Sequence, residues 1–272
     1  MIDEINLDEC LKNQWVSNYK KYKVLIDVDL TEYEKFNKEF YDHFAFFNYD
    51  FNLAMSCIGK NGFRGREAFL RQICMNPAEY TNVRKVIMAH SAGFMRTLQA
   101  RKKFIANHPK KIEIANRILA YRPDSKAITF SPTIKVAEKI QYGGVLHSKQ
   151  TKKTRNMTIE EFSAMKTGCI NTSKSLDTGN DIPGVNLGII LGIDSSKTRL
   201  VQRIGRVIRY APDKEAEIFV LVINNTVECE WARRSSDVSS YITIDEDNLD
   251  CVLKNQPFKE KRERSFGMQF HQ

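Results

Sequence analysis

The chain has 272 residues, which is enough for one large domain or two modest ones. Hydrophobic residues make up 42% and charged residues 28%, as in ordinary soluble globular proteins, and no apolar run approaches the roughly 20 residues of a membrane span. The formal net charge of +9 is compatible with nucleic-acid binding, although charge alone does not establish it.

The six cysteines are scattered without a C-x-x-C pair, and the five histidines are equally dispersed. This spacing argues against a structural zinc site, against any other metal centre and against a disulfide framework. The first residues, Met1 to Ile5, lack the basic start and apolar core of a signal peptide. We therefore expect reduced thiols in a cytoplasmic protein without membrane contact.

The first part of the chain reads as a strand followed by a helix. Residues 23–30 have the apolar character of a buried strand, and residues 32–47 form a helical pattern rich in aromatic side chains. Such an aromatic stripe could stack on nucleic-acid bases, but its helical spacing favours packing in a core.

A basic, glycine-rich segment at residues 59–66 looks superficially like a phosphate loop. It lacks the G-K-[ST] ending and no apolar strand precedes it, so we reject that interpretation. We expect a basic loop or a short helical insertion instead. In either structure Lys60, Arg64 and Arg66 could still touch a backbone phosphate.

From residue 82 onward the pattern changes to two helices, at 82–105 and 109–121, and then to alternating strands and helices. The strands are expected at 126–130, 143–148, 169–172, 186–191 and 217–223. This alternation predicts an α/β fold: a mostly parallel sheet with helices on both faces, preceded by a mainly helical N-terminal extension. Functional loops in such sheets lie at the carboxyl ends of the strands.

Residues 202–209 have an unusual pattern of basic side chains. At about 100° per residue, a helix here places its apolar residues on one face and Gln202, Arg206 and Arg209 nearly opposite. Guanidinium groups suit phosphate recognition, whereas Gly205 lowers helix propensity by about 1 kcal/mol relative to Ala. For two isolated arginines, a solvated basic surface helix is the simpler interpretation. The surrounding motifs decide between this interpretation and a phosphate-binding helix.

A second motif, G-x-D-[IV]-P at Gly179 to Pro183, lies upstream of the Q-x-x-G-R-x-x-R motif at Gln202 to Arg209. At this separation the pair resembles motifs V and VI in the C-terminal RecA-like domain of superfamily 2 helicases and translocases. The resemblance covers roughly residues 98–232 and looks closest to DNA-repair and phage recombination helicases and the motor subunits of restriction enzymes.

The resemblance suggests three regions. We expect a RecA-like helicase C-terminal domain at 106–235, an N-terminal strand-helix lead-in with a helical insertion at 1–105, and a C-terminal extension at 236–272.

The resemblance also implies roles for single residues at a nucleotide site. Arg206 and Arg209 match the catalytic motif VI arginines that reach the phosphates of ATP, one of them as an arginine finger. Gln202 matches the polar residue near the γ-phosphate. Gly179 and Asp181 match motif V, which links the nucleotide cleft to the nucleic-acid track.

Six further positions would contact nucleic acid at the carboxyl ends of strands. By the resemblance they are Ser131, His147, Ser148, Thr172, Ser173 and Lys174. For His147 a purely structural role is an equally good interpretation. Thr178 departs from the Glu or Arg that many relatives carry before the motif V glycine, so the details of motif V coupling stay open.

A phosphate loop, G-x-x-x-x-G-K-[ST], and an acidic D-E-x-[HD] motif for magnesium do not occur in the sequence. ATP and Mg²⁺ would therefore be held mainly by a first RecA-like domain, supplied by a missing part of the protein or by a separate chain. We expect the second motor domain of an ATP-dependent nucleic-acid helicase or translocase, with DNA as the expected polymer, although the sequence does not distinguish DNA from RNA. The alternatives are a non-catalytic module that binds nucleic acid or a partner and, with little support, an unrelated α/β enzyme.

Overall fold

The computed structural model describes residues 10–11, 13, 15–173, 182–194, 196–235, 241–258 and 260. The chain divides into two compact units. One consists of residues 1–28 and 106–272 and is called the sheet unit; the other consists of residues 29–105 and is called the helical insertion. Each unit has a hydrophobic core of its own.

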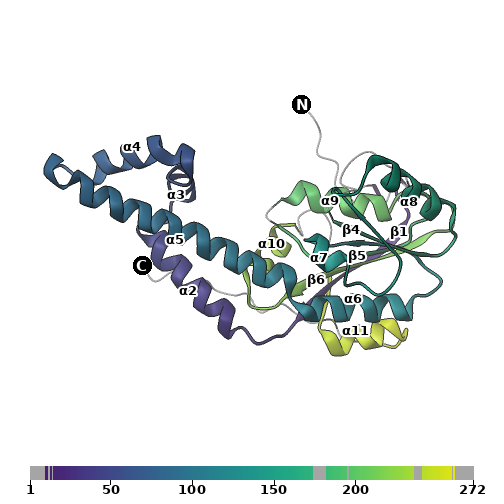
Figure 1. Cartoon of the computed structure of the whole chain (residues 1–272). Coiled ribbons are helices and arrows are strands. Elements are labelled where there is room, and N and C mark those ends of the chain that lie inside the picture. Colours follow the sequence, from purple (N-terminus) through teal and green to yellow (C-terminus); the bar gives the residue numbers. More distant parts are fainter. Residues whose placement is uncertain are drawn as a thin grey trace. The chain divides into compact units, whose positions relative to one another are not determined.

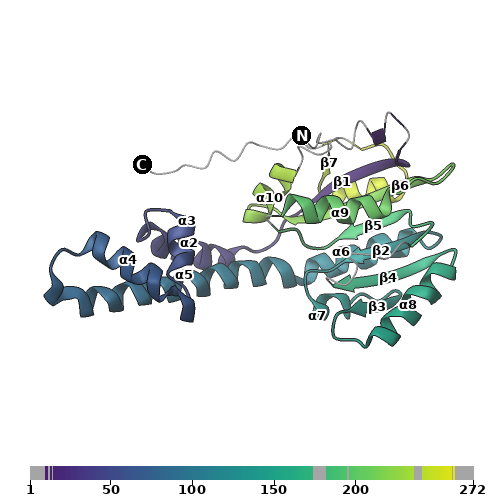
Figure 2. The same ribbon diagram turned by 90° about the horizontal axis from the view of Figure 1, so that it is seen from above.

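The sheet unit is built on a parallel sheet that has seven strands among the described residues, in the order β3-β4-β2-β5-β6-β1-β7 (Figure 1, Figure 2). The strands are β1 (Asn18–Ile26), β2 (Lys126–Phe130), β3 (Gly144–His147), β4 (Gly168–Ser173), β5 (Leu187–Ile190), β6 (Glu215–Ile223) and β7 (Ile242–Ile244). The expected α/β architecture with a parallel sheet is confirmed.

Helices cover both faces of this sheet. One face is covered by α6 (Pro109–Tyr121), α7 (Ile134–Ala137) and α11 (Glu246–Leu253), and the other by α8 (Lys152–Ala164), α9 (Lys197–Val207) and α10 (Val227–Ser235). Along β6, Ile218, Val220 and Val222 pack toward α9, while Phe219 and Leu221 pack toward α6. This alternation follows from the pleat, and burial on both faces explains why the strand is a continuous apolar run.

The sheet unit extends beyond the expected domain at residues 106–235 on both sides. β1 pairs along its whole length with β6, and β7 pairs with β1. Leu249, Val252 and Leu253 of α11 are buried in the core on one face of the sheet. Segments from the expected lead-in and from the expected C-terminal extension therefore contribute to the same core.

Several element boundaries differ by a few residues from the sequence prediction. β1 begins and ends earlier than the expected strand at residues 23–30, because its polar first residues pair with the start of β6. Helix α8 begins at Lys152, where the Thr151 hydroxyl accepts a hydrogen bond from the Thr154 amide at 3.2 Å. Thr158 lies inside α8 and donates its hydroxyl to the Thr154 carbonyl.

The helical insertion consists of α2 (Thr31–Ala45), α3 (Phe51–Ser56), α4 (Phe63–Ile73) and most of α5 (Tyr80–Asn107), with 3-10 turns η1 (Lys60–Gly62) and η2 (Pro77–Glu79). Its core is aromatic: Phe40, Phe47, Phe69 and Phe94 are buried, and the rings of Phe40 and Phe94 lie 5.0 Å apart. Core packing is therefore the right interpretation for Phe40 of α2 and for Phe47, which follows the end of that helix. In the described part of the chain, no helix is long and apolar enough to cross a membrane.

Candidate functional site

Helix α9 carries the basic motif and lies close against the sheet. Ser196 caps its first turn by accepting a hydrogen bond from the Arg199 amide at 3.4 Å. Ile204 and Val207 are buried against the sheet. The close approach requires glycine at position 188 of β5, since a Cβ on Gly188 would come within 2.7 Å of a Val207 methyl group. The apolar face of α9 is thus fixed and its polar face is turned outward.

The outward face of α9 carries Gln202 and Arg206. The Gln202 side chain is exposed and that of Arg206 is half-buried. Gly205 lies beside them, and a Cβ placed on this glycine would meet no atom within 4 Å. Packing among the described residues therefore does not require a glycine at position 205. The outward face of α9 has room here for another molecule to approach.

Arg209 lies outside this helix, contrary to the prediction that it shares a helical face with Gln202 and Arg206. α9 ends before Arg209, which instead forms an antiparallel bridge with Val16. Pro212 follows shortly, and proline disfavours helical backbone at the preceding residue. This restriction falls on Ala211, so it does not by itself end the helix at Val207.

Side chains from outside α9 hold the backbone of Arg209. Ser17, buried just before β1, donates its hydroxyl to the Arg209 carbonyl at 2.9 Å and accepts from the Ala211 amide at 3.0 Å. Lys214 donates from Nζ to the same carbonyl at 2.8 Å. Partial burial, and then the charge of Arg209, lower the pKa of Lys214 to about 8. Burial is the main cause of this lowered pKa, and the nearby charge of Arg209 is the smaller one.

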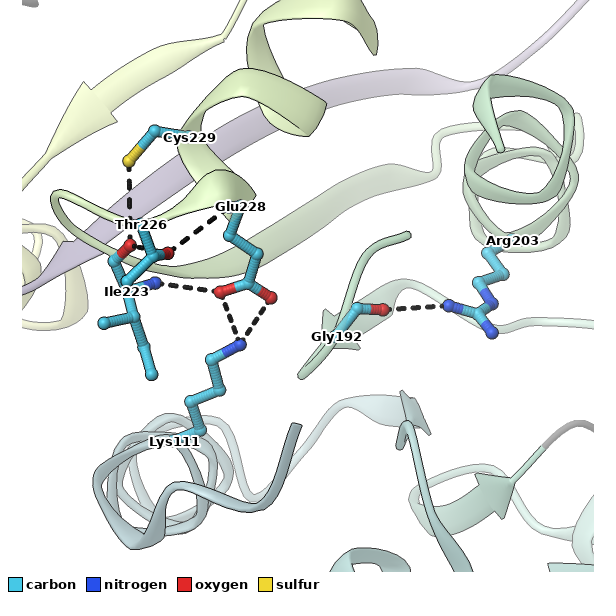
Figure 3. A network of polar contacts seen from close by, with 7 residues as sticks. All are labelled: Lys111, Gly192, Arg203, Ile223, Thr226, Glu228 and Cys229. Atoms are coloured by element: carbon cyan, nitrogen blue, oxygen red, sulfur yellow. Dashed lines mark hydrogen bonds and ion pairs between the residues drawn. The ribbon is translucent and has the colours of Figure 1, made fainter. Parts of the chain in front are cut away.

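A buried ion pair between Lys111 and Glu228 lies next to the connection between β5 and α9 (Figure 3). Lys111 Nζ is 2.6 and 2.7 Å from the two carboxylate oxygens, and the two side chains are only 1% and 0% exposed. Glu228 also accepts hydrogen bonds from the amides of Ile223, at 3.0 Å, and Ile193. Burial lowers the pKa of Lys111 and raises that of Glu228, and their mutual attraction opposes both changes.

This ion pair joins three segments that are distant in sequence. Lys111 belongs to α6, Glu228 to α10, and Ile193 to the connection that leads into α9. In the same connection, the Gly192 carbonyl accepts a hydrogen bond from Arg203 Nη1 at 3.0 Å, as Figure 3 shows. The pair and Arg203 together hold the backbone of the connection that leads into α9.

Sequence reasoning did not assign roles to Lys111 and Arg203. For Lys111 a signal existed, since it stands one turn before Ile114 and Ala115 on the apolar face of the helix at 109–121. A lysine on such a face requires a buried partner or a path to solvent, because an isolated buried charge is costly. The sequence alone does not identify that partner as Glu228.

Residues expected to contact nucleic acid lie at the carboxyl ends of β2, β3 and β4. Strand register places His147 beside Ser173. Ser131, Thr172 and Ser173 are buried, and Thr172 donates its hydroxyl to the Thr129 carbonyl at 3.0 Å. The Ser131 hydroxyl and His147 Nδ1 are buried without a hydrogen-bond partner among the described residues. Such atoms are suited to a polar ligand, because buried polar groups normally have partners.

The remaining predicted residues are divided between the surface and the part of the chain that is not described. Ser148 is exposed in the turn after β3. Lys174, Gly179 and Asp181 lie outside the described residues. Within the described ranges, no group of three or more His, Cys, Asp or Glu side chains is arranged to hold a metal ion.

Comparisons with known proteins match part of the sheet unit to a family model. Residues 110–211 match the model of the helicase conserved C-terminal domain. The DNA 3'-5' translocase XPB2 of Sulfurisphaera tokodaii is 30% identical over 131 residues, which are 47% of this chain and 30% of that protein. The mitochondrial ATP-dependent RNA helicase MSS116 of Phaeosphaeria nodorum is 33% identical over 89 residues, 30% of this chain and 16% of that protein. The matches thus span less than a third of either relative.

Solved structures similar to this chain include two DEAD-box proteins. S. cerevisiae Dbp5 bound to RNA and ADP BeF3 aligns with a TM-score of 0.47 at 18% identity, covering 55% of this chain and 42% of Dbp5. The E. coli DEAD-box protein SrmB, bound to the regulator of ribonuclease activity A, aligns with a TM-score of 0.44 at 16% identity, covering 57% of this chain and 92% of that chain.

Proposed function

Because residues 110–211 match the model of the helicase conserved C-terminal domain, we propose that the chain is the second motor domain of an ATP-dependent nucleic-acid helicase or translocase of superfamily 2. In this proposal a first RecA-like domain, carried elsewhere, binds ATP and Mg²⁺. The present chain supplies the arginines of the composite site and part of the nucleic-acid track.

The observation that carries the proposal is the arrangement of positive charge around α9. Arg206 lies on an outward face beside the open space at Gly205, and Arg209 follows with its backbone held by Ser17. Lys214 Nζ donates to the Arg209 carbonyl at 2.8 Å, which brings a third basic side chain to this end of α9. A triphosphate therefore suits the residues that are present.

Each basic residue has a defined role in this proposal. Arg206 and Arg209 stabilise the negative charge that develops on the transferring phosphoryl group, one of them as the arginine finger. Gln202 binds near the γ-phosphate. Gly179 and Asp181 link this site to the nucleic-acid track. Mg²⁺ neutralises phosphate charge when it is bound by the first domain.

Nucleic acid is proposed to follow the carboxyl ends of β2, β3 and β4. Ser131, His147, Ser148, Thr172, Ser173 and Lys174 contact its phosphate backbone there. The unpartnered Ser131 hydroxyl and His147 Nδ1 support a polar ligand at this edge. DNA is the proposed polymer. One matched relative is named a DNA translocase and the other an RNA helicase, so the two polymers must be compared directly.

The test combines this chain with a candidate first-domain chain that carries the G-K-[ST] and D-E-x-[HD] motifs. Phosphate release is measured with ATP and either single-stranded DNA or RNA. Arg206→Ala and Arg209→Ala are each expected to lower the hydrolysis rate, by roughly 10³- to 10⁵-fold for the residue that acts as the finger. The control is Arg234→Ala, which removes an exposed arginine of α10 paired with Glu230 and should leave the rate unchanged.

Two outcomes count against parts of the proposal. Hydrolysis that neither Arg206→Ala nor Arg209→Ala affects removes the arginine-finger assignment. Nucleic-acid binding that never leads to hydrolysis, with a first-domain chain that binds ATP, favours the non-catalytic binding module.

A further inference from the structure

We propose that the helical insertion carries a second contact for single-stranded nucleic acid, at the corner that residues 51–66 form. This segment, called the basic corner, comprises α3, η1 and the start of α4. The inference deepens the proposed function by adding a contact outside the RecA-like fold, and it relies on that function for the kind of polymer.

The basic corner has a one-sided charge. Residues 51–66 contain Lys60, Arg64 and Arg66 and no Asp or Glu. The flanking carboxylates are occupied: Asp50 accepts hydrogen bonds from two amides at the start of α3, and Glu67 forms an ion pair with Arg84. Residues 51–66 themselves therefore carry only positive charge, which suits a phosphate backbone.

Large apolar side chains of the basic corner face solvent. Phe63 is 60% exposed, Phe51 is 47% exposed and Met55 is also exposed. Helices α3 and α4 also contribute to a hydrophobic core, because Ala54 of α3 and Phe69 of α4 are buried in the aromatic core. The exposure of the other side chains is therefore not due to the absence of a core in this region. Exposed aromatic rings beside basic side chains are typical of surfaces on which unpaired bases stack.

Side-chain hydrogen bonds hold the backbone of the basic corner in place. Arg66 Nη1 donates hydrogen bonds to the carbonyls of Cys57, at 2.7 Å, and Gly59, at 3.1 Å. These bonds tie the end of α3 to the start of α4. Arg66 is thus occupied within the fold, whereas Arg64 is exposed and has no ion-pair partner among the described residues.

Phe63 and Arg64 are the residues best suited to contact the ligand. They are adjacent at the start of α4 and both are exposed. The ring of Phe63 offers a stacking surface for a base, and the guanidinium of Arg64 offers a partner for a neighbouring phosphate. A single strand suits this pair because its bases are free to stack, whereas those of a duplex are already stacked and paired.

The experiment measures binding of a fluorescein-labelled oligothymidylate of about 20 nucleotides, longer than the roughly 4–16 that one binding fold covers. The full chain is used at several salt concentrations, and oligouridylate is tested in parallel to compare RNA. Phe63→Ala is expected to weaken binding about tenfold. Arg64→Ala should lower the slope of log affinity against log salt by about 0.7, and Arg64→Lys should retain that slope.

Two exposed residues of the sheet unit provide matched controls. Tyr121→Ala removes an aromatic ring at the end of α6, and Lys166→Ala removes a charge before β4. Both variants should bind like the wild type. If Phe63→Ala and Arg64→Ala also bind like the wild type at every salt concentration, the proposal is overturned and the corner is better explained as a protein-docking surface. The assay contains no ATP and no first-domain chain, so failure of the hydrolysis test does not decide it.

Discussion

Replacing Lys111 by methionine leaves the carboxylate of Glu228 buried without its cation. Removal of one partner from a buried ion pair typically costs about 3–5 kcal/mol. Two backbone amides, of Ile223 and Ile193, still donate hydrogen bonds to this carboxylate. We therefore expect Lys111→Met to lower the free energy of unfolding of the sheet unit by about 3 kcal/mol, the lower end of that range.

The double variant Lys111→Met/Glu228→Gln tests the cause of that loss. Glutamine keeps an oxygen that accepts from a backbone amide, and no unpaired charge remains. Replacement of a whole buried pair by uncharged groups is often close to neutral. We expect the double variant to lie within about 1 kcal/mol of the wild type, so that the second substitution restores about 2 kcal/mol.

Urea unfolding followed by tryptophan fluorescence measures these differences. Trp15 and Trp231 both lie in the sheet unit, so the signal reports that unit and not the helical insertion. Lys110→Met is the control. Lys110 is partly exposed and pairs with Glu113, so its ion pair should contribute less than about 1 kcal/mol to the free energy of unfolding. The reasoning is refuted if Lys111→Met costs no more than Lys110→Met, or if the double variant is the least stable of all.

The remaining predictions concern three other positions. Gly205→Ala should raise the free energy of unfolding by about 1 kcal/mol, because the added methyl group meets no neighbour within 4 Å; a loss of stability in urea would contradict this. Ser17→Ala should cost about 1 kcal/mol and speed hydrogen exchange at the Ala211 amide, which unchanged exchange would disprove. Burial and then His43 lower the pKa of His90, so the unfolded chain takes up this proton at a higher pH than the folded chain does. Acidification through about pH 6.5 should therefore destabilise the helical insertion, less so in His90→Gln, and equal pH dependence in thermal melts followed by circular dichroism would refute this.

Local patterns were sufficient to predict most elements of the sheet unit. The helix expected at 109–121 is α6, and the strand expected at 126–130 is β2. Both depend on neighbouring residues: apolar periodicity, a proline at the first helical position and a buried β-prone run. Alternation of such elements was sufficient to predict a parallel sheet with helices on both faces.

The candidate site could be predicted only in part. Motif spacing identified α9 as the basic helix, but periodicity continued that helix through Arg209. In the structure the chain leaves the helix there because Val16 and Ser17 provide backbone and side-chain partners. These partners lie at the opposite end of the chain, so no local pattern could reveal them.

The sequence by itself determined the α/β class, the basic motif of α9 and the aromatic nature of the insertion. These features arise from residues within a few positions of one another. Only the tertiary structure decided that β1 lies between β6 and β7 and that Lys111 pairs with Glu228. Strand order and buried ion pairs depend on which segments, distant in sequence, pack against each other. The folded arrangement is the one that leaves few backbone polar groups and buried charges without partners across the whole core.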